Sequence, residues 1–362
     1  MKPNALFPFV LLVAGYSAQA ADYSRPTAPP VSHFQGACDS DPDGKKFAER
    51  ACYTSYNPAD AGYRDEYRSP TCDKRRSLTD QQRQLLAKAY IRSPDYMKGK
   101  LCRLTQVFVT DDTTEGPMGW GYWEGADRPP GKGVFVAVAA SELRTTKSVA
   151  ERENETFDEL LQVRGGGKRA RPARLIAKAP PDPELAVLVG LAHELGHTLL
   201  ADSNADGGDE NHPRREVSGP PQSSCFEDAF IGSSWDADRF HHNMTRWVEF
   251  GVQNHNRPKN PDVRFNLHRL RASAERGRLD GANDVLKRVY RSREFVSFAA
   301  VIRPEEDFAE TYKYKVLLDA GSQSIEFQLG RLNISVPELL KSDVLSKKVE
   351  CLRALGMLTG GP

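Results

Sequence analysis

The sequence predicts an α+β fold in which a small sheet packs on one long apolar helix, with a cystine-stabilised N-terminal region. Apolar residues recur with helical spacing after residue 182, and runs at 106–109 and 134–138 have the length and β-branched content of buried strands. Six cysteines are spread over the chain. With 362 residues, of which 39% are hydrophobic, the chain can bury a sizeable core in one large or two modest domains.

The first residues predict export. Lys2 precedes an apolar run over residues 5–15 that is too short to span a bilayer, and Ala18-Gln19-Ala20 has the small-x-small pattern of a cleavage site. We expect residues 1–20 to be a signal peptide, cleaved near Ala20, and the mature chain to be secreted or periplasmic. An uncleaved anchor is the alternative. No later segment could cross a membrane, so stable membrane insertion is not expected.

All cysteines follow the expected cleavage site, and an even number in an exported chain predicts up to three disulfides whose pairing the spacing leaves open. Residues 21–76 are rich in Pro, Asp, Tyr and Cys and form an N-terminal cysteine-containing segment, followed by a larger domain over residues 77–362. A metal-bound thiolate of Cys38 or Cys52 is the alternative to a disulfide there. The cysteines are Cys38, Cys52, Cys72, Cys102, Cys225 and Cys351.

The formal net charge of +1 offers no overall attraction to nucleic acid or to an anionic membrane. Local signals then give the elements in order. The expected helices run from a cap at residues 77–80 to about residue 91, from Asp182-Pro183 through Leu199, in pieces over 226–255, from Pro304, and from Pro337 onward; the expected strands cover residues 106–109, 134–138 and 324–329.

The helix after Pro183 contains His193-Glu194-Leu195-Gly196-His197. Two histidines one turn apart share a helix face, so both imidazoles can reach one ion, and neutral imidazole is a good ligand for Zn²⁺. Glu194 lies beside that ion without binding it, where its carboxylate can take a proton from a water on the metal. The pattern predicts a zinc site, one ion per chain, with His193 and His197 as ligands and Glu194 as general base. Two histidines that only pack or cap are the alternative.

A third ligand is needed, and the metzincin class is excluded because Ser203 stands where its third histidine would be. Asp202, Asp206 and Asp209 are close in sequence but have no diagnostic spacing. The helix opened by Pro304 instead places Glu306 and Glu310 four residues apart on one face, with Phe308 and Ala309 turned elsewhere. We predict Glu306 as the third ligand and Glu310 as the hydrogen-bond partner of a ligating histidine. An acidic first turn that stabilises the helix is the alternative.

The string Pro304-Glu305-Glu306-Asp307-Phe308-Ala309-Glu310, preceded by residues 295–300, resembles the second signature of bacterial gluzincins, zinc metallopeptidases related to the catalytic domain of anthrax lethal factor. The resemblance covers only this stretch and the His193 motif. It implies a zincin fold, with Glu306 as zinc ligand and Glu310 as its support. Those relatives carry a tyrosine seven residues before the glutamate ligand, where this chain has Ala299. Oxyanion stabilisation would then come from elsewhere, and His241, His242, Tyr312 and Tyr314 are unranked candidates.

Residues 202–207 match the opening of a calcium loop, with Asp202, Asn204 and Asp206 at alternate positions and Gly207 at the turn. Pro213 stands where an EF-hand needs its bidentate glutamate. Ca²⁺ binding is therefore the secondary interpretation, and an acidic solvated loop is favoured.

The sequence thus predicts an exported zinc metalloendopeptidase that acts on a protein or peptide substrate. The Glu306 helix is expected to cross the His193 helix, and an edge strand at Val134–Val138 to align substrate by strand addition. The alternative is a zincin-fold protein that keeps the metal and acts as a binding or interaction module, which Ala299 favours. Satisfied packing is the default for His241, His242 and His255, and aromatic packing for Trp120, Tyr122 and Trp123.

Overall fold

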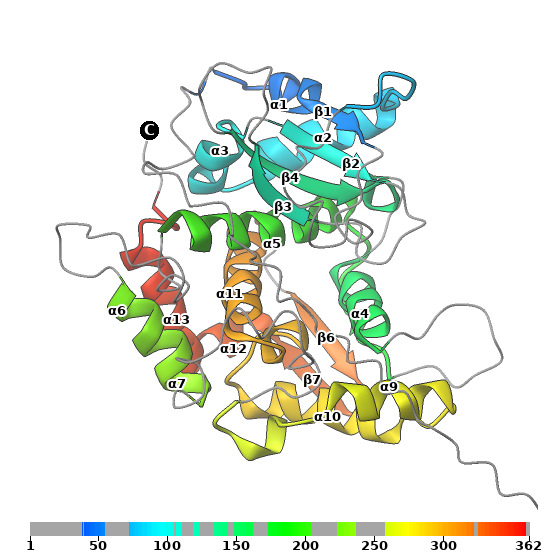
Figure 1. Cartoon of the computed structure of the whole chain (residues 1–362), viewed down its shortest axis with the longest axis vertical. Coiled ribbons are helices and arrows are strands. Elements are labelled where there is room, and N and C mark those ends of the chain that lie inside the picture. The colour runs from blue at the N-terminus through cyan, green and yellow to red at the C-terminus, as the bar shows by residue number, and fades with distance from the viewer. Residues whose placement is uncertain are drawn as a thin grey trace, which may run out of the picture.

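The computed structural model describes residues 38, 40–54, 72–104, 106–110, 119–123, 133–143, 148–161, 173–203, 223–236, 258–321 and 325–359. The fold is mixed α+β with mostly helices and two small sheets (Figure 1). The helices are α1 (Lys45–Glu49), α2 (Asp80–Arg92), α3 (Asp95–Leu101), α4 (Val149–Leu160), α5 (Pro183–Ser203), α6 (Ser223–Phe226), α7 (Gly232–Ser234), α9 (Leu267–Glu275), α10 (Asp280–Ser292), α11 (Pro304–Asp319), α12 (Val336–Leu340) and α13 (Asp343–Ala354), with short helical turns η1 (Ala140–Leu143), η2 (Glu227–Ile231, π-helical), η5 (Pro261–Val263) and η6 (Ala299–Val301).

The larger sheet has the strand order β1-β2-β4-β3, with β1 (Ala51–Tyr53), β2 (Gln106–Thr110), β3 (Gly119–Trp123) and β4 (Gly133–Ala139). β1, β2 and β4 are parallel, and β3 pairs antiparallel with β4 in the register Gly119 to Ala137. The predicted strands over 106–109 and 134–138 are confirmed. The prediction that Val134–Val138 forms an edge is wrong, because β3 covers that side of β4. Glycines kept residues 119–123 from being predicted as a strand, although cross-strand pairing accommodates them here.

A second sheet joins β5 (Ile176–Ala177), β6 (Glu326–Leu329) and β7 (Leu332–Ser335) in an antiparallel arrangement. The predicted strand at 324–329 is confirmed from Glu326 onward. Its pairing with β5, about 150 residues earlier in the chain, has no local sequence signal.

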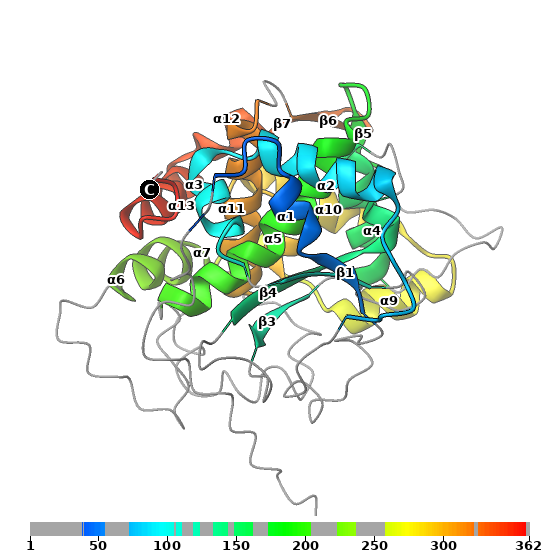
Figure 2. The ribbon, with the colours of Figure 1, turned by 90° about the horizontal axis from the view of Figure 1, so that it is seen from above.

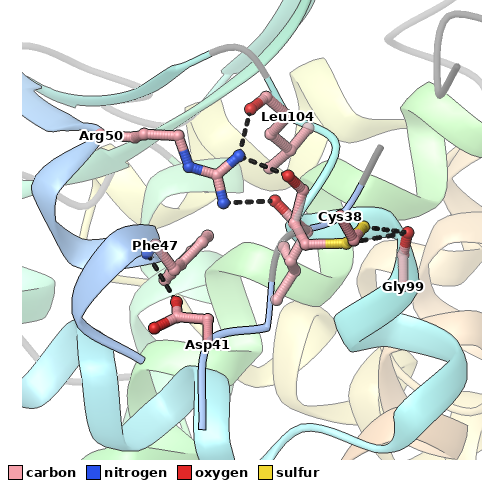
Figure 3. Close-up of a disulfide and its surroundings, with 8 residues drawn as sticks. Cys38, Asp41, Phe47, Arg50, Gly99 and Leu104 are labelled. Carbon is pink, nitrogen blue, oxygen red and sulfur yellow. Dashed lines mark hydrogen bonds between the residues drawn. A yellow bond between two sulfur atoms is a disulfide. The ribbon is translucent and has the colours of Figure 1, made fainter. Parts of the chain in front are cut away.

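The N-terminal segment is part of the larger sheet through β1, and two disulfides hold it: Cys38–Cys102 and Cys52–Cys72. Beside the first disulfide, the Arg50 guanidinium donates hydrogen bonds of 2.6 Å to the carbonyls of Cys102 and Leu104 after α3 (Figure 3). The disulfides are as predicted for this region, and both Cys38 and Cys52 are cystines rather than thiolates. A third disulfide, Cys225–Cys351, joins α6 to α13.

Helix α5 forms the centre of the molecule. It packs against β3 and β4 on one side and crosses α11 on the other, with α2 and α4 also in contact (Figures 1 and 2). Its start is as predicted: the Asp182 carboxylate accepts a hydrogen bond from the Leu185 amide and Pro183 occupies the first turn. Leu188, Leu191 and Leu195 are fully buried, which fixes the helix in this position.

Helix α11 begins at Pro304, as predicted, and three acidic residues in its first turn stabilise its N-terminus. It approaches α5 closely at Gly196, where an added Cβ would lie 2.9 Å from the Ala309 Cα atom. Ala309 was expected to turn away from the glutamate face; instead it packs on Gly196. These two small residues set the distance between the helices that carry the predicted site residues.

Among the described residues, no helix combines the length and apolar character needed to cross a membrane. The expected signal peptide at residues 1–20, the residues Asn204, Asp206 and Asp209, and the histidines His241, His242 and His255 lie outside the described residues. Asp202 falls in the last turn of α5.

Candidate metal centre

The crossing of α5 and α11 brings His193, His197 and Glu306 together. The Nε2 atoms of the two histidines are 3.2 Å apart, and Glu306 Oε2 lies 3.4 Å from His193 Nε2 and 3.5 Å from His197 Nε2. Glu306 follows the two histidines by more than 100 positions in sequence, and the three residues direct one donor atom each at a common point. The group can hold a metal ion.

The spacing of the donor atoms tests which ion fits. Ligands bound to Zn²⁺ at about 2.0–2.1 Å in tetrahedral geometry lie about 3.3 Å from one another. The observed separations of 3.2, 3.4 and 3.5 Å agree with this value. Two imidazoles and one carboxylate also leave the fourth position for water or substrate, as catalytic zinc sites do. The donor set does not by itself select zinc over other first-row divalent metals.

Glu306 is held in place from its far side by Arg303. The guanidinium Nη2 and Nε atoms donate to Oε1 at 2.6 and 3.1 Å, which leaves Oε2 directed at the histidines. Burial alone would raise the pKa of Glu306, but His197 and Arg303 outweigh it and hold the pKa well below its usual value. The carboxylate is thus ionised and ready to bind a cation.

His193 uses its other ring nitrogen to contact Glu310, whose Oε1 atom lies 2.7 Å from Nδ1. Burial lowers the pKa of His193, but the hydrogen bond and charge of Glu310 outweigh burial and raise it to about 9 in the metal-free protein. Burial raises the pKa of Glu310, but the charge of Lys313 and the contact with His193 outweigh burial and lower it to about 2. An ionised Glu310 accepts a hydrogen bond from the Nδ1–H group of His193, so Nε2 is the nitrogen that faces the metal position.

Glu194 lies beside the three donor atoms and outside the set. Its Oε1 atom is 4.0 Å from His193 Nε2, and its side chain is almost fully buried. Burial is the main cause that raises its pKa, against the nearby histidines. A carboxylate with a raised pKa, next to the open coordination position, can accept a proton and return it.

Of the predicted oxyanion candidates, His241 and His242 lie outside the described residues, and the two tyrosines lie on α11. Tyr312 and Tyr314 are fully buried, and burial raises the pKa of each above its usual range. Ala299, at the position where the resembling family has tyrosine, is buried in η6 against α11.

Sequence reasoning missed Lys313 and Glu153, which lie behind Glu310. The Lys313 Nζ atom is within 2.8 Å of both Glu310 oxygens and 2.6 Å from Glu153 Oε1. A signal was present: Glu153 is flanked at helical spacing by Val149 and Phe157, so it lies on the apolar face of α4. A charged residue on such a face needs a buried partner.

No family model, curated protein or solved structure matches this chain.

Proposed function

We propose that the protein is an exported zinc metallopeptidase of the gluzincin type. The observation that carries the proposal is the arrangement of three donor atoms, 3.2 to 3.5 Å apart, with the Glu194 carboxylate beside them at 4.0 Å. The architecture supports it: a helix bearing both histidines packs under a small sheet, and a crossing helix supplies the carboxylate. The three disulfides support export, because such bonds persist in oxidising compartments.

A divalent metal bound at this site would act as a Lewis acid on the scissile carbonyl and on a water molecule. The protein's own groups do the rest. Glu194 accepts the proton that the attacking water loses and delivers it to the leaving amine. His193 is oriented by Glu310, and Glu306 by Arg303, so that neither ligand has to reorganise during the reaction.

Substrate alignment is assigned to β3 rather than to β4. Among the described strands β3 pairs only with β4, and it contacts α5. Its other edge can therefore take an extended peptide by strand addition, next to the helix that carries the histidines. We propose that a protein or peptide substrate binds there in extended form.

Hydrolysis of casein by the purified mature chain tests the proposed activity. The wild-type protein should cleave casein, chelation should stop cleavage, and zinc should restore it. Glu194→Gln should lose activity by about 100-fold to 10,000-fold, the usual contribution of a general acid-base group. The same variant should keep its metal, since Glu194 is not a ligand. Cleavage by Glu194→Gln at the wild-type rate would contradict the assigned mechanism.

A binding module that keeps the metal is the second candidate function, and Ala299 favours it. The absence of a tyrosine there removes one electrophilic group that the resembling family uses, and Tyr312 and Tyr314 are buried away from solvent. A stoichiometric metal content without hydrolysis of any unfolded protein substrate would favour this candidate over the peptidase.

A further inference from the structure

A buried chain of polar groups extends behind His193, away from the metal position. Glu310 Oε1 contacts His193 Nδ1 at 2.7 Å, and Lys313 Nζ contacts the two Glu310 oxygens at 2.8 and 2.6 Å. Glu153 Oε1, on α4, lies 2.6 Å from the same Nζ atom. Glu310, Lys313 and Glu153 are 1%, 3% and 5% exposed, so water does not compete for these contacts. This series of polar contacts links α4, α11 and α5.

The hydrogen bonds around Lys313 and Glu310 match the number of protons that the lysine can donate. A lysine ammonium has three protons, and three carboxylate oxygens lie within hydrogen-bond distance of Lys313. The Ser297 hydroxyl also donates to Glu310 Oε2, because its oxygen accepts from the Ala300 amide at 3.2 Å. Lys313 and Ser297 thus donate to Glu310 on the side away from α5. In its remaining contact, Glu310 Oε1 accepts a hydrogen bond from the Nδ1–H group of His193.

Charge also favours this arrangement. Two buried carboxylates flank one buried cation, and a buried charge is tolerated only when it is paired and hydrogen-bonded. Burial by itself lowers the pKa of Lys313, but Glu153 and Glu310 outweigh it and raise the pKa above its usual value. Burial raises the pKa of Glu153, against the effect of Lys313. Tyr314 places its ring 4.8 Å from Nζ, and this cation-π contact adds to the pairing.

We propose that Lys313, held in place by Glu153, is a positioning residue for the metal ligand His193. Lys313 fixes the Glu310 carboxylate in the orientation in which it accepts from Nδ1, and so directs the Nε2 lone pair of His193 at the metal. This inference rests on the proposed function, because it assigns a role toward the same metal site.

A purely structural ion pair is the rival explanation, and the molecule contains a matched example. Lys348 on α13 lies 2.6 Å from Asp307 on α11, and both side chains are fully buried. The Asp307 carboxylate also accepts a hydrogen bond of 3.1 Å from the Trp235 indole N–H, where Glu310 contacts a histidine. Loss of this pair removes a buried lysine that contacts α11 from α13, without touching the contacts of His193.

The test compares Co²⁺-loaded proteins. Lys313→Met removes the cation, and the double variant Glu153→Met/Lys313→Met removes one carboxylate with it, so that the buried net charge is unchanged and folding is preserved. The control is Asp307→Asn/Lys348→Met. For each protein the Co²⁺ affinity is measured by competition with a chelator, and the visible absorption spectrum of the bound ion reports its ligand geometry.

The Glu153→Met/Lys313→Met variant should bind Co²⁺ about 10-fold more weakly than wild type, in the lower range of losses seen when outer partners of metal ligands are removed. Its absorption spectrum should also change, whereas the control should keep both the affinity and the spectrum of the wild-type protein. A folded double variant that matches wild type, or a control that changes equally, would overturn the role of Lys313 and leave the proposed function standing. Failure of the wild-type protein to take up Co²⁺ or Zn²⁺ would instead overturn both.

Discussion

Two faces of α11 carry the same kind of buried charge pair, and they differ in what lies beyond it. On one face Lys313 pairs with Glu310, and Glu310 continues to His193. On the other face Lys348 pairs with Asp307, and Asp307 ends at the Trp235 indole. The first pair is connected to a group that can bind metal, and the second is enclosed by helix packing. The role of each buried ion pair therefore depends on the group that its carboxylate contacts next, which is His193 for Glu310 and Trp235 for Asp307.

The largest effect is expected on the Asp307 face. Lys348→Met leaves the Asp307 carboxylate buried without its cation, which should lower the free energy of unfolding by about 3–5 kcal/mol. Urea unfolding monitored by tryptophan fluorescence measures this loss. Metal content per folded chain should stay the same, and a large drop in metal affinity at unchanged stability would contradict the division between the two faces.

On the Glu310 face, substitution should mainly lower metal affinity rather than stability. Glu310→Gln keeps the shape of the side chain but weakens the contact to His193 Nδ1, and metal affinity should fall about 10-fold to 100-fold. Isothermal titration with Zn²⁺ measures the change, with Glu305→Gln as control, because Glu305 is in the same helical turn and outside the site. Equal affinities in the two variants would show that Glu310 has no role in metal binding.

The contact between the two helices can be altered without changing any charge. Gly196→Ala places a Cβ atom 2.9 Å from the Ala309 backbone, so α5 and α11 must move apart. Overpacking of this kind costs about 1–3 kcal/mol of stability. It should also weaken metal binding, because His197 lies on α5 and Glu306 on α11, and moving the helices apart separates these two ligands. Gly281→Ala, where the nearest atom is a side-chain carbon at 3.7 Å, is the control; it should keep metal binding and should not lower stability, because alanine is favoured over glycine in a helix.

Metal affinity should also depend on pH, and its change over one pH unit is the smallest effect expected here. The pKa of His193 is about 9 in the metal-free protein, so below that pH a metal must displace one proton from the ring. Zn²⁺ affinity should therefore rise about tenfold per pH unit up to about 9 and level off above it, since metal and proton compete for the same group. Affinities measured at intervals from pH 7 to 10 provide the test. A flat profile between pH 7 and 9 would mean that Glu310 does not raise the pKa.

The sequence predicted the site helices because their signals are local. The Asp182 cap, the apolar spacing of α5 and Pro304 each act within one or two turns, and the structure has both helices at the predicted starts. The position of β4 inside the sheet could not be predicted, because strand order depends on the glycine-rich β3. The apolar face of α4 indicates that Glu153 needs a buried partner, but it does not identify Lys313, which is 160 residues away in sequence.

The central claim is that His193, His197 and Glu306 together bind one metal ion. Elemental analysis of the purified mature chain tests it most directly, with His197→Ala and Glu306→Ala measured in parallel and Glu305→Ala as the control. We expect about one zinc per chain in wild type and in the control, and loss of zinc from both ligand variants during purification, because two remaining protein ligands hold the ion much more weakly than three. A wild-type protein without zinc, or a Glu306→Ala variant that retains it fully, would contradict the claim.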